Sequence, residues 1–360
     1  MRKILIIIIF VSGFRSLAQD STREKNSSVS FIGYAELYYG YDFNRPFDNN
    51  RPAFVYSYNR HNEITVNLAF LKAAYSSEGI RGNIAIAAGT YMNANYAAEP
   101  GVLKNIFEAN VGKKLSKHGN LWIDAGIMPS HIGFESAIGK DCWALTRSIL
   151  ADNSPYYESG VKITYVSGNG KWLLSGLALN GWQRIQRVAG NSLISWGTQV
   201  SFKPSSKLTL NYSTFLGTDK PDSARLWRYF HNTYCIFQLS EVIGLTLGFD
   251  LGQEQVSKGS NELNTWFSPV ALLRITPDNN WAVAMRGEYY DDKKSVIVAT
   301  GSPNGFRTFG ASVNIDRSIG SHFLWRTEVK TFINRDEIFV SPNGTTNTNT
   351  VITMLFVLSF

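Results

Sequence analysis

The sequence predicts an all-β protein: a transmembrane antiparallel β-barrel of about 16 strands, within a range of roughly 14 to 18. Three observations lead to this prediction. Segments of about ten residues alternate apolar with polar side chains, their connections alternate long with short, and the chain ends on an apolar segment with a terminal Phe360. We expect the short connections to be periplasmic turns and the long ones to be extracellular loops.

The strands are predicted from side chains that alternate with a period of two. In segment 243–252, the odd positions hold Ile, Leu, Leu, Phe and Leu, and the even positions hold Gly, Thr, Gly, Asp and Gly. One face of such a strand suits lipid and the other suits water. The sixteen expected strands are 29–41, 63–75, 80–91, 105–115, 121–128, 156–167, 171–183, 194–203, 208–216, 227–239, 243–252, 265–276, 281–290, 305–316, 322–332 and 350–360.

The connections between these strands alternate strictly between long and short. The short ones are rich in Gly, Pro, Asn and Ser, which suit tight turns, and they are 76–79, 116–120, 168–170, 204–207, 240–242, 277–280 and 317–320. The long ones are 42–62, 92–104, 129–155, 184–193, 217–226, 253–264, 291–304 and 333–349. A soluble β-sandwich has no reason for this asymmetry, whereas a transmembrane barrel does.

The N-terminus predicts a secretory signal peptide over residues 1–18. A basic start precedes an apolar run, Ile4 to Val11, and Ser16-Leu17-Ala18 places small residues before the expected cleavage point. A membrane anchor is the alternative, but it needs about 20 apolar residues. Residues 19–360 are then expected to form a single barrel domain in the outer membrane of a Gram-negative bacterium.

Composition excludes several classes of function. The 360 residues are 44% hydrophobic, 13% aromatic and only 18% charged, against about 25% charged in typical soluble domains. Loss of the signal peptide removes three basic residues and lowers the net charge from +7 to +4. So small a positive charge does not indicate a nucleic-acid-binding protein. Two Cys exclude a disulfide scaffold, and five scattered His show no metal-ligand spacing, so we expect neither a metal nor a cofactor.

The strand number points to a pore. Sixteen strands leave an aqueous channel, whereas about eight are filled by their own side chains. Only Gln19 to Ser28 lie between the signal peptide and the first strand, which leaves no room for a plug. We therefore expect a non-enzymatic porin for passive diffusion of small polar solutes. The alternative is a receptor or adhesin that binds ligands through its long extracellular loops.

The inward face of the strands carries charges of both signs. The predicted pore-lining residues are Glu36, Arg81, Asp124, Lys162, Asp250, Arg286, Glu288, Arg326, Glu328 and Lys330. These charges suit cross-strand ion pairs that stiffen the wall. They equally suit a transverse field that orients polar solutes, and neither interpretation predicts a strong ion preference.

The connection 129–155 is the longest and has unusual amphipathic content, with a short helix expected over 140–150. We hypothesise that it folds into the lumen, where His131, Glu135, Asp141 and Arg147 line a constriction. An external lid packed on neighbouring loops is the alternative.

Aromatic side chains crowd the strand ends, as in the girdles that barrels place at the lipid headgroups. They include Tyr38, Tyr39, Tyr91, Trp122, Tyr156, Tyr157, Tyr229, Trp266, Trp281, Tyr289 and Tyr290. A stacking track for sugars inside the pore is the alternative. The terminal Phe360 resembles the signal read by the barrel assembly machinery, so that machinery and outer-membrane lipid are expected partners.

Two further arrangements of residues bear on function. Ser130 beside His131, with Glu135 nearby, suggests a hydrolase only weakly, because the Asn-His-x-Ser pattern of outer-membrane phospholipases is absent. Cys142 and Cys235 could pair if the long connection folds back, and they could equally be free.

Several runs resemble the β-barrel porin family of OmpL-like outer-membrane proteins. They include Gly33-Tyr34-Ala35-Glu36, Tyr58-Asn59-Arg60-His61-Asn62-Glu63 and the stretch from Asp124 to Glu135. The resemblance extends from about residue 30 to 340. It implies an outer-membrane barrel with pore function and supplies no particular substrate. By fold analogy, a homo-oligomer is compatible with it.

Overall fold

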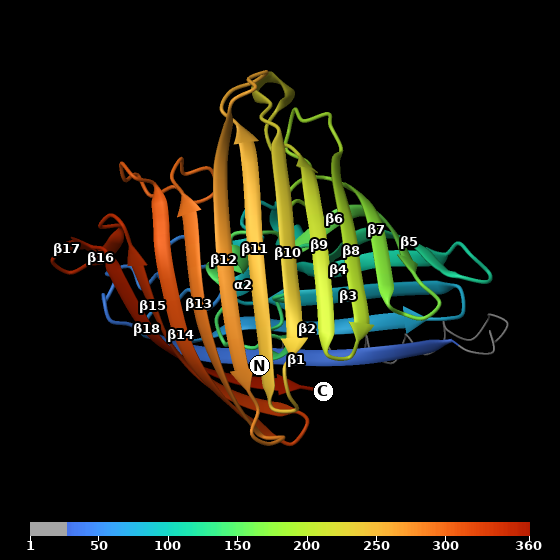
Figure 1. Cartoon of the computed structure of the whole chain (residues 1–360), viewed down its shortest axis with the longest axis horizontal. Helices are drawn as coiled ribbons and strands as arrows, with labels where there is room; N and C mark the ends of the chain where they lie inside the picture. Colours follow the sequence, from blue (N-terminus) through green and yellow to red (C-terminus); the bar gives the residue numbers. More distant parts are fainter. Residues whose placement is uncertain (1–26) are drawn as a thin grey trace, which may run out of the picture.

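A computed structural model describes residues 27–360, which form one closed barrel of sixteen antiparallel strands (Figure 1). The strands are β1 (Ser28–Asp42), β2 (Ile64–Ser76), β3 (Ile80–Ala88), β4 (Ile106–Lys114), β5 (Asn120–Pro129), β6 (Tyr157–Val166), β7 (Trp172–Leu179), β8 (Ser195–Ser205), β9 (Leu208–Gly217), β10 (Arg228–Gln238), β11 (Ile243–Gln255), β12 (Leu263–Ile275), β13 (Trp281–Asp292), β14 (Phe306–Ile319), β15 (Phe323–Asn334) and β18 (Thr348–Ser359). Each strand pairs with its neighbours along the chain, and β18 pairs with β1 to close the wall. The predicted fold class is confirmed.

The strands present polar side chains inward and apolar side chains outward. On β14 the buried positions include Thr308, Ser312, Asn314 and Asp316, while the intervening Phe309, Val313 and Ile315 are exposed. The same alternation runs around the barrel, so its outer surface is an apolar band. Because every strand of the wall pairs with a neighbour on both sides, this surface can face lipid without an open sheet edge.

The connections lie at two different ends of the barrel. The long ones, which we call the long-loop end, follow β1, β3, β5, β7, β9, β11, β13 and β15. The short ones, the short-turn end, follow the even-numbered strands from β2 to β14. A small hairpin, β16 (Phe339–Ser341) with β17 (Gly344–Thr346), was not expected and lies in the last long connection.

The helices are short and lie in the long connections. They are α2 (Thr90–Asn95), α3 (Ile149–Asp152) and the 3₁₀ turns η2 (Gly101–Asn105), η3 (Gly139–Asp141) and η4 (Asp222–Ala224). Among residues 27–360, no helix has the length and apolar character needed to cross a membrane.

The helix expected over 140–150 is wrong. Only η3 and the start of α3 fall in this range, and the residues between them are non-helical. The physical reason lies in their backbone amides. Leu145 N–H donates to the Asn314 side chain and Thr146 N–H donates to the Glu328 carboxylate, so the barrel wall takes the donors that a helix would use internally.

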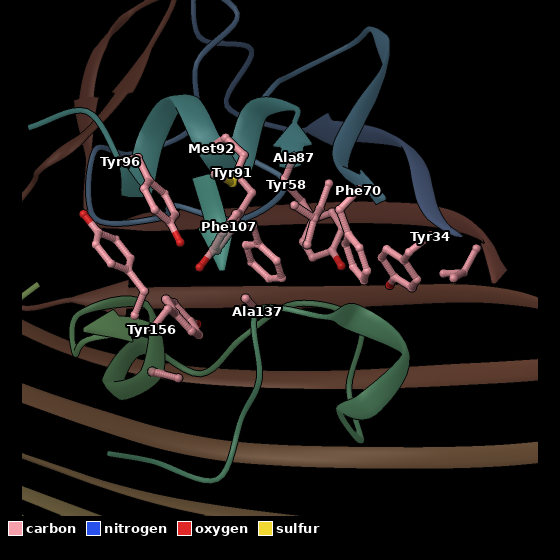
Figure 2. Close-up of a cluster of buried hydrophobic side chains, with 14 of the residues drawn as sticks. Tyr34, Tyr58, Phe70, Ala87, Tyr91, Met92, Tyr96, Phe107, Ala137 and Tyr156 are labelled. Carbon is pink, nitrogen blue, oxygen red and sulfur yellow. The ribbon is translucent and has the colours of Figure 1, made fainter. Parts of the chain in front are cut away.

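Many of the aromatics expected in the headgroup girdles lie inside the barrel instead. The buried ones are Tyr38, Tyr91, Tyr156, Tyr157, Trp266 and Tyr290, so the girdle prediction is wrong for these residues. Figure 2 shows part of the resulting aromatic cluster. Tyr96 stacks on Tyr157 with ring centroids 3.9 Å apart, and the Phe70 ring lies between Tyr34 and Phe107 at 5.1 and 5.3 Å. These rings cover one another and therefore form a core, not an open track for sugars.

The C-terminal residue completes the seam between β18 and β1. Phe360 exchanges two backbone hydrogen bonds with Gly33, of 2.7 and 3.0 Å, and its ring occupies the space above that glycine. The signal peptide predicted over residues 1–18 lies outside the described residues.

Candidate functional site

The 129–155 segment lies inside the barrel. It leaves β5 at the long-loop end, yet Lys140 Nζ donates to the Ser321 carbonyl oxygen at 3.2 Å and to Ser359 Oγ at 2.6 Å. Both of these residues belong to the short-turn end. The segment therefore descends through the lumen to its far end and returns to β6. In Figure 2 part of it runs beside the strands, below the aromatic cluster.

Arg326 of β15 holds the deepest part of the segment. Its guanidinium donates to the carbonyl oxygens of Gly139, Cys142 and Ala144 at 2.7, 2.7 and 3.2 Å. The same group forms a bidentate pair with Asp316 of β14, with two contacts of 2.7 Å. Because Arg326 is only 1% exposed, these bonds form away from bulk water, where charged hydrogen bonds are strong.

A second group of wall charges holds the returning part. Arg286 of β13 donates to the Thr146 carbonyl and hydroxyl oxygens at 2.8 Å and to the Glu328 carboxylate at 2.7 Å. Lys330 of β15 donates to the Arg147 carbonyl oxygen at 2.9 Å. The predicted inward charges of β13 and β15 are thus paired with one another and with the backbone of the segment.

Hydrogen bonds within the 129–155 segment also stabilise its conformation. Glu135 accepts hydrogen bonds from the backbone N–H and the hydroxyl of Ser148. Arg147 is fully buried and donates to the carbonyl oxygens of Ser136, Leu145 and Ala137 at 2.6, 2.8 and 3.2 Å. These contacts join its descending and returning halves into one compact body.

The beginning of the segment is held by His131. Its Nδ1 lies 2.7 Å from a Glu158 carboxylate oxygen of β6, and its Nε2 lies 2.8 Å from the Thr214 carbonyl oxygen of β9. Burial alone lowers the pKa of His131, but Glu158 and the two hydrogen bonds outweigh burial and raise that pKa above its usual value. Ser130 donates to the same Glu158 at 2.9 Å. Ser130 and His131 are thus both bonded to Glu158, and no bond joins them as a nucleophile and its base require.

The sequence-predicted site residues divide into buried and accessible groups. All ten predicted pore-lining residues occur at inward positions of the strands. Eight of them are at most 6% exposed: Glu36, Asp124, Asp250, Arg286, Glu288, Arg326, Glu328 and Lys330. Arg81 and Lys162 are more accessible. Of the four segment residues, His131, Glu135 and Arg147 are buried and Asp141 is exposed.

Neutral side chains also hold the segment, and sequence reasoning missed them. The Asn232 side chain of β10 accepts from Gly133 N–H at 3.1 Å, and Ser213 Oγ of β9 donates to the His131 carbonyl oxygen at 2.8 Å. Their inward positions follow from the strand alternation. Nothing in the sequence marks them as partners of a segment about 80 to 100 residues away.

The inward face of β2 to β6 is less covered near the short-turn end. Arg81 forms a bidentate pair with Asp124 at 2.6 and 2.7 Å, its guanidinium lies 4.3 Å from the Trp122 ring centroid, and its side chain is 39% exposed. Lys72 pairs with Glu108 at 2.7 Å. This part of the wall therefore meets water inside the barrel.

Lys114 and Lys162 lie on the same part of the wall at inward, half-buried positions. Neither has a salt-bridge partner within 4.0 Å among residues 27–360. The accessible part of the lumen thus carries a small excess of positive charge.

No group of three or more metal-ligating side chains occurs in the part of the chain that the structure describes. Cys142 and Cys235 are both free thiols. Cys142 is buried inside the barrel, whereas Cys235 lies on the apolar outer side of β10, facing Leu210 and Leu247 of the adjacent strands. The wall therefore separates the two thiols.

Solved porin structures share this architecture. The anion-selective porin from Comamonas acidovorans superposes with a TM-score of 0.62 at 10% identity, over 93% of this chain and 100% of that one. The trimer form of OmpT, an outer-membrane protein of Vibrio cholerae, gives 0.62 at 6% identity over 93% and 100%. The outer-membrane channel DcaP of Acinetobacter baumannii gives 0.60 at 11% identity over 94% and 99%. At such identities the likeness concerns the fold.

A search of curated proteins finds no match. The sequence profile of a family does match, over residues 28–360, which is the whole of the barrel. Its description is "Putative beta-barrel porin-2, OmpL-like". The closed barrel of sixteen strands, its polar interior and this match agree, and the chain belongs to the OmpL-like β-barrel porin-2 family.

Proposed function

We propose that this porin is a passive diffusion pathway for small polar solutes across the outer membrane of a Gram-negative bacterium. Its long-loop end faces the medium and its short-turn end faces the periplasm. Solutes pass between the 129–155 segment and the less covered wall of β2 to β6. The segment narrows the lumen, and Asp141 and Lys162 are polar groups at the edges of the remaining path.

One observation carries this proposal: the charged anchors of the segment gather on β13 and β15, while part of the wall at β3 stays accessible to water. These anchors, Arg286, Arg326 and Lys330, belong to β13 and β15, whereas Arg81 on β3 remains 39% exposed at its side chain. A segment that leaves part of the inward wall of a sixteen-stranded barrel accessible narrows an aqueous channel without filling it.

The wall offers no support for a catalytic role. The Ser130 hydroxyl and the His131 ring are both committed to Glu158, so we propose a non-enzymatic channel. Outer-membrane lipid and the barrel assembly machinery are its proposed partners, the latter through Phe360. Assembly into trimers is a further proposal, supported by the trimer form reported for the Vibrio cholerae relative in fold.

Single-channel conductance of the refolded barrel in a planar bilayer tests the function. We expect a stable open conductance, and a larger one after deletion of residues 138–151, because that deletion removes the deepest part of the segment. Heat-modifiable migration on a gel verifies that both proteins are folded barrels. No conductance from folded wild-type barrels contradicts the pore, and unchanged conductance after deletion contradicts the constriction.

A further inference from the structure

A cavity at the long-loop end has no lining residue from the 129–155 segment. Its volume is about 610 Å³, which is within the range of small-molecule sites. Three long connections form most of its lining: 43–63, 293–305 and the last connection, which carries the β16–β17 hairpin. Ala94 of α2 adds to it. Figure 1 shows this hairpin at one edge of the barrel.

Arg51 lines this cavity with an unpaired charge. The residue is 4% exposed, and none of its three guanidinium nitrogens has a hydrogen-bond partner among residues 27–360. The nearest acids leave the guanidinium without an ion pair. Asp42 accepts instead from Asn349 at 2.8 Å and from the Asn44 amide at 2.9 Å. A buried cation without a partner is strongly unfavourable, so the site is chemically incomplete as it stands.

Two residues that line the same cavity carry orphaned acceptors. The side-chain oxygens of Asn59 and Asn349 are buried and have no hydrogen-bond donor among residues 27–360. The amide nitrogen of Asn349 donates to both carboxylate oxygens of Asp42. This contact fixes the side chain with its own oxygen pointing away from Asp42 and without a donor. The cavity thus lacks one anion for Arg51 and one or two donors for the amide oxygens.

The remaining lining is apolar. Phe54, Val298 and Phe339 are each at most 6% exposed and contribute to the cavity wall. The Phe54 ring lies 6.3 Å from that of Phe339. Such a surface suits an apolar group of a ligand, whereas an inorganic anion leaves it unfilled.

We propose that this cavity binds a small organic acid that carries a hydroxyl or ammonium group near its carboxylate and an apolar side group. The carboxylate pairs with Arg51, and the hydroxyl or ammonium group donates to the side-chain oxygens of Asn59 and Asn349. The apolar group packs on Phe54 and Phe339. The guanidinium fork matches a carboxylate in a bidentate manner. Binding here is independent of conduction, so its failure and the failure of the pore are separate results.

Isothermal titration calorimetry with the full-length folded barrel in detergent tests this proposal, with 3-phenyllactate as the probe. Two matched molecules dissect the contacts: 3-phenylpropionate lacks the hydroxyl group, and 3-phenyl-1-propanol lacks the carboxylate. We expect saturable binding of phenyllactate, several-fold weaker binding of phenylpropionate and no saturable binding of the alcohol. The alcohol also measures partition into the detergent.

Arg51→Met should weaken phenyllactate binding at least tenfold. Arg45→Met is the matched control, because Arg45 lies on the same connection, is exposed and does not line the cavity. This control should bind as the wild type does. If Arg51→Met does not give a folded barrel, Val298→Trp fills the cavity without touching the charge and should abolish binding.

Three outcomes overturn the proposal. One is the absence of phenyllactate binding to the wild-type barrel. Another is equal binding to the wild type and to the folded Arg51 or Val298 variant. The third is equal affinity for the acid and the alcohol, which indicates an apolar crevice with no role for the guanidinium.

Discussion

Arg326 Nη1 of β15 lies 2.7 Å from the carbonyl oxygen of Gly139, at the innermost point of the 129–155 segment. The bond joins two parts of the chain that are 187 residues apart. Since Asp316 occupies the other side of the same guanidinium, the arginine couples the segment to two strands at once. Inward charges of this barrel thus position a segment of backbone.

Replacing Arg326 should loosen the segment. Arg326→Met leaves the buried Asp316 carboxylate without its bidentate partner and frees the carbonyl oxygens of Gly139 and Cys142. Breaking a buried pair of this kind costs about 3 to 5 kcal/mol. We expect a lower midpoint of urea unfolding and a larger or flickering single-channel conductance.

Arg317→Met is the control for this variant. Arg317 lies on the outer side of β14, with its guanidinium 4.8 Å from the Trp281 ring centroid, and it has no contact with the segment. It should conduct as the wild type does. A steady wild-type conductance from Arg326→Met contradicts the anchoring role.

His131 should make the stability of the barrel depend on pH. Both ring nitrogens face acceptors, the Glu158 carboxylate and the Thr214 carbonyl, so the protonated ring fits this site best. Despite burial, which lowers the pKa of His131, these partners raise it overall. The pKa is thus higher in the folded than in the unfolded chain. The stabilisation is therefore fully present below the unfolded value of about 6.5 and is lost as pH rises through the folded value.

His131→Gln should remove this dependence. Below pH 6 the variant should be less stable than the wild type by about 2 kcal/mol, the order of a charged hydrogen bond. The difference should shrink as pH rises above neutrality. Urea unfolding at several pH values measures it, and parallel pH profiles for the two proteins contradict the assigned role.

Lys162 should bias the pore toward anions. Arg81 and Lys72 on the same wall are neutralised by Asp124 and Glu108, whereas Lys162 has no salt-bridge partner in the described part of the chain. Lys162→Glu should shift the reversal potential, measured in a tenfold KCl gradient, toward cation preference. Lys207→Glu makes the same change of charge on an exposed turn and should shift the potential less. Equal shifts indicate an effect of net charge alone.

Gly126 should be irreplaceable on β5. Its φ of 128° is unfavourable for other residues, and a Cβ there would overlap the Ala109 carbonyl oxygen of β4. Gly126→Ala should cost about 1 to 3 kcal/mol. Gly176→Ala on β7 is the matched control, because a Cβ there meets nothing within 4 Å. The temperature at which the compact form disappears on a gel compares them, and equal temperatures contradict the argument.

The strands could be predicted because their alternation is local. Each of the sixteen expected segments became a strand, with ends that moved by a few residues beside long and short connections alike. The segment 80–91 shows why. Its strand stops at Ala88, because Gly89 turns the chain with a φ of 134° and α2 follows. A helix of six residues carries too little periodicity to be recognised in the sequence.

The site could be predicted only in part. The inward charges of β13 to β15 follow from the same alternation, and the amphipathic content of 129–155 suggested entry into the lumen. The pairing of Arg326 with Gly139, or of Lys330 with Arg147, could not be foreseen, since it depends on a descent of backbone through the barrel. Tyr91 and Tyr156 were misplaced for a related reason. Aromatic rings suit a headgroup girdle and a buried cluster equally well.

The distance along the chain between the segment and its anchors also dictates an order of assembly. Lys140 bonds to Ser359, which lies 219 residues later. A chain delivered N-terminus first thus presents the segment before β13, β15 and β18 exist to receive it. Unpaired backbone polar groups are strongly unfavourable in lipid, so the segment stays in contact with water until its partner strands are present. Joining β18 to β1 therefore closes the wall and also supplies the last of these anchors, Ser359.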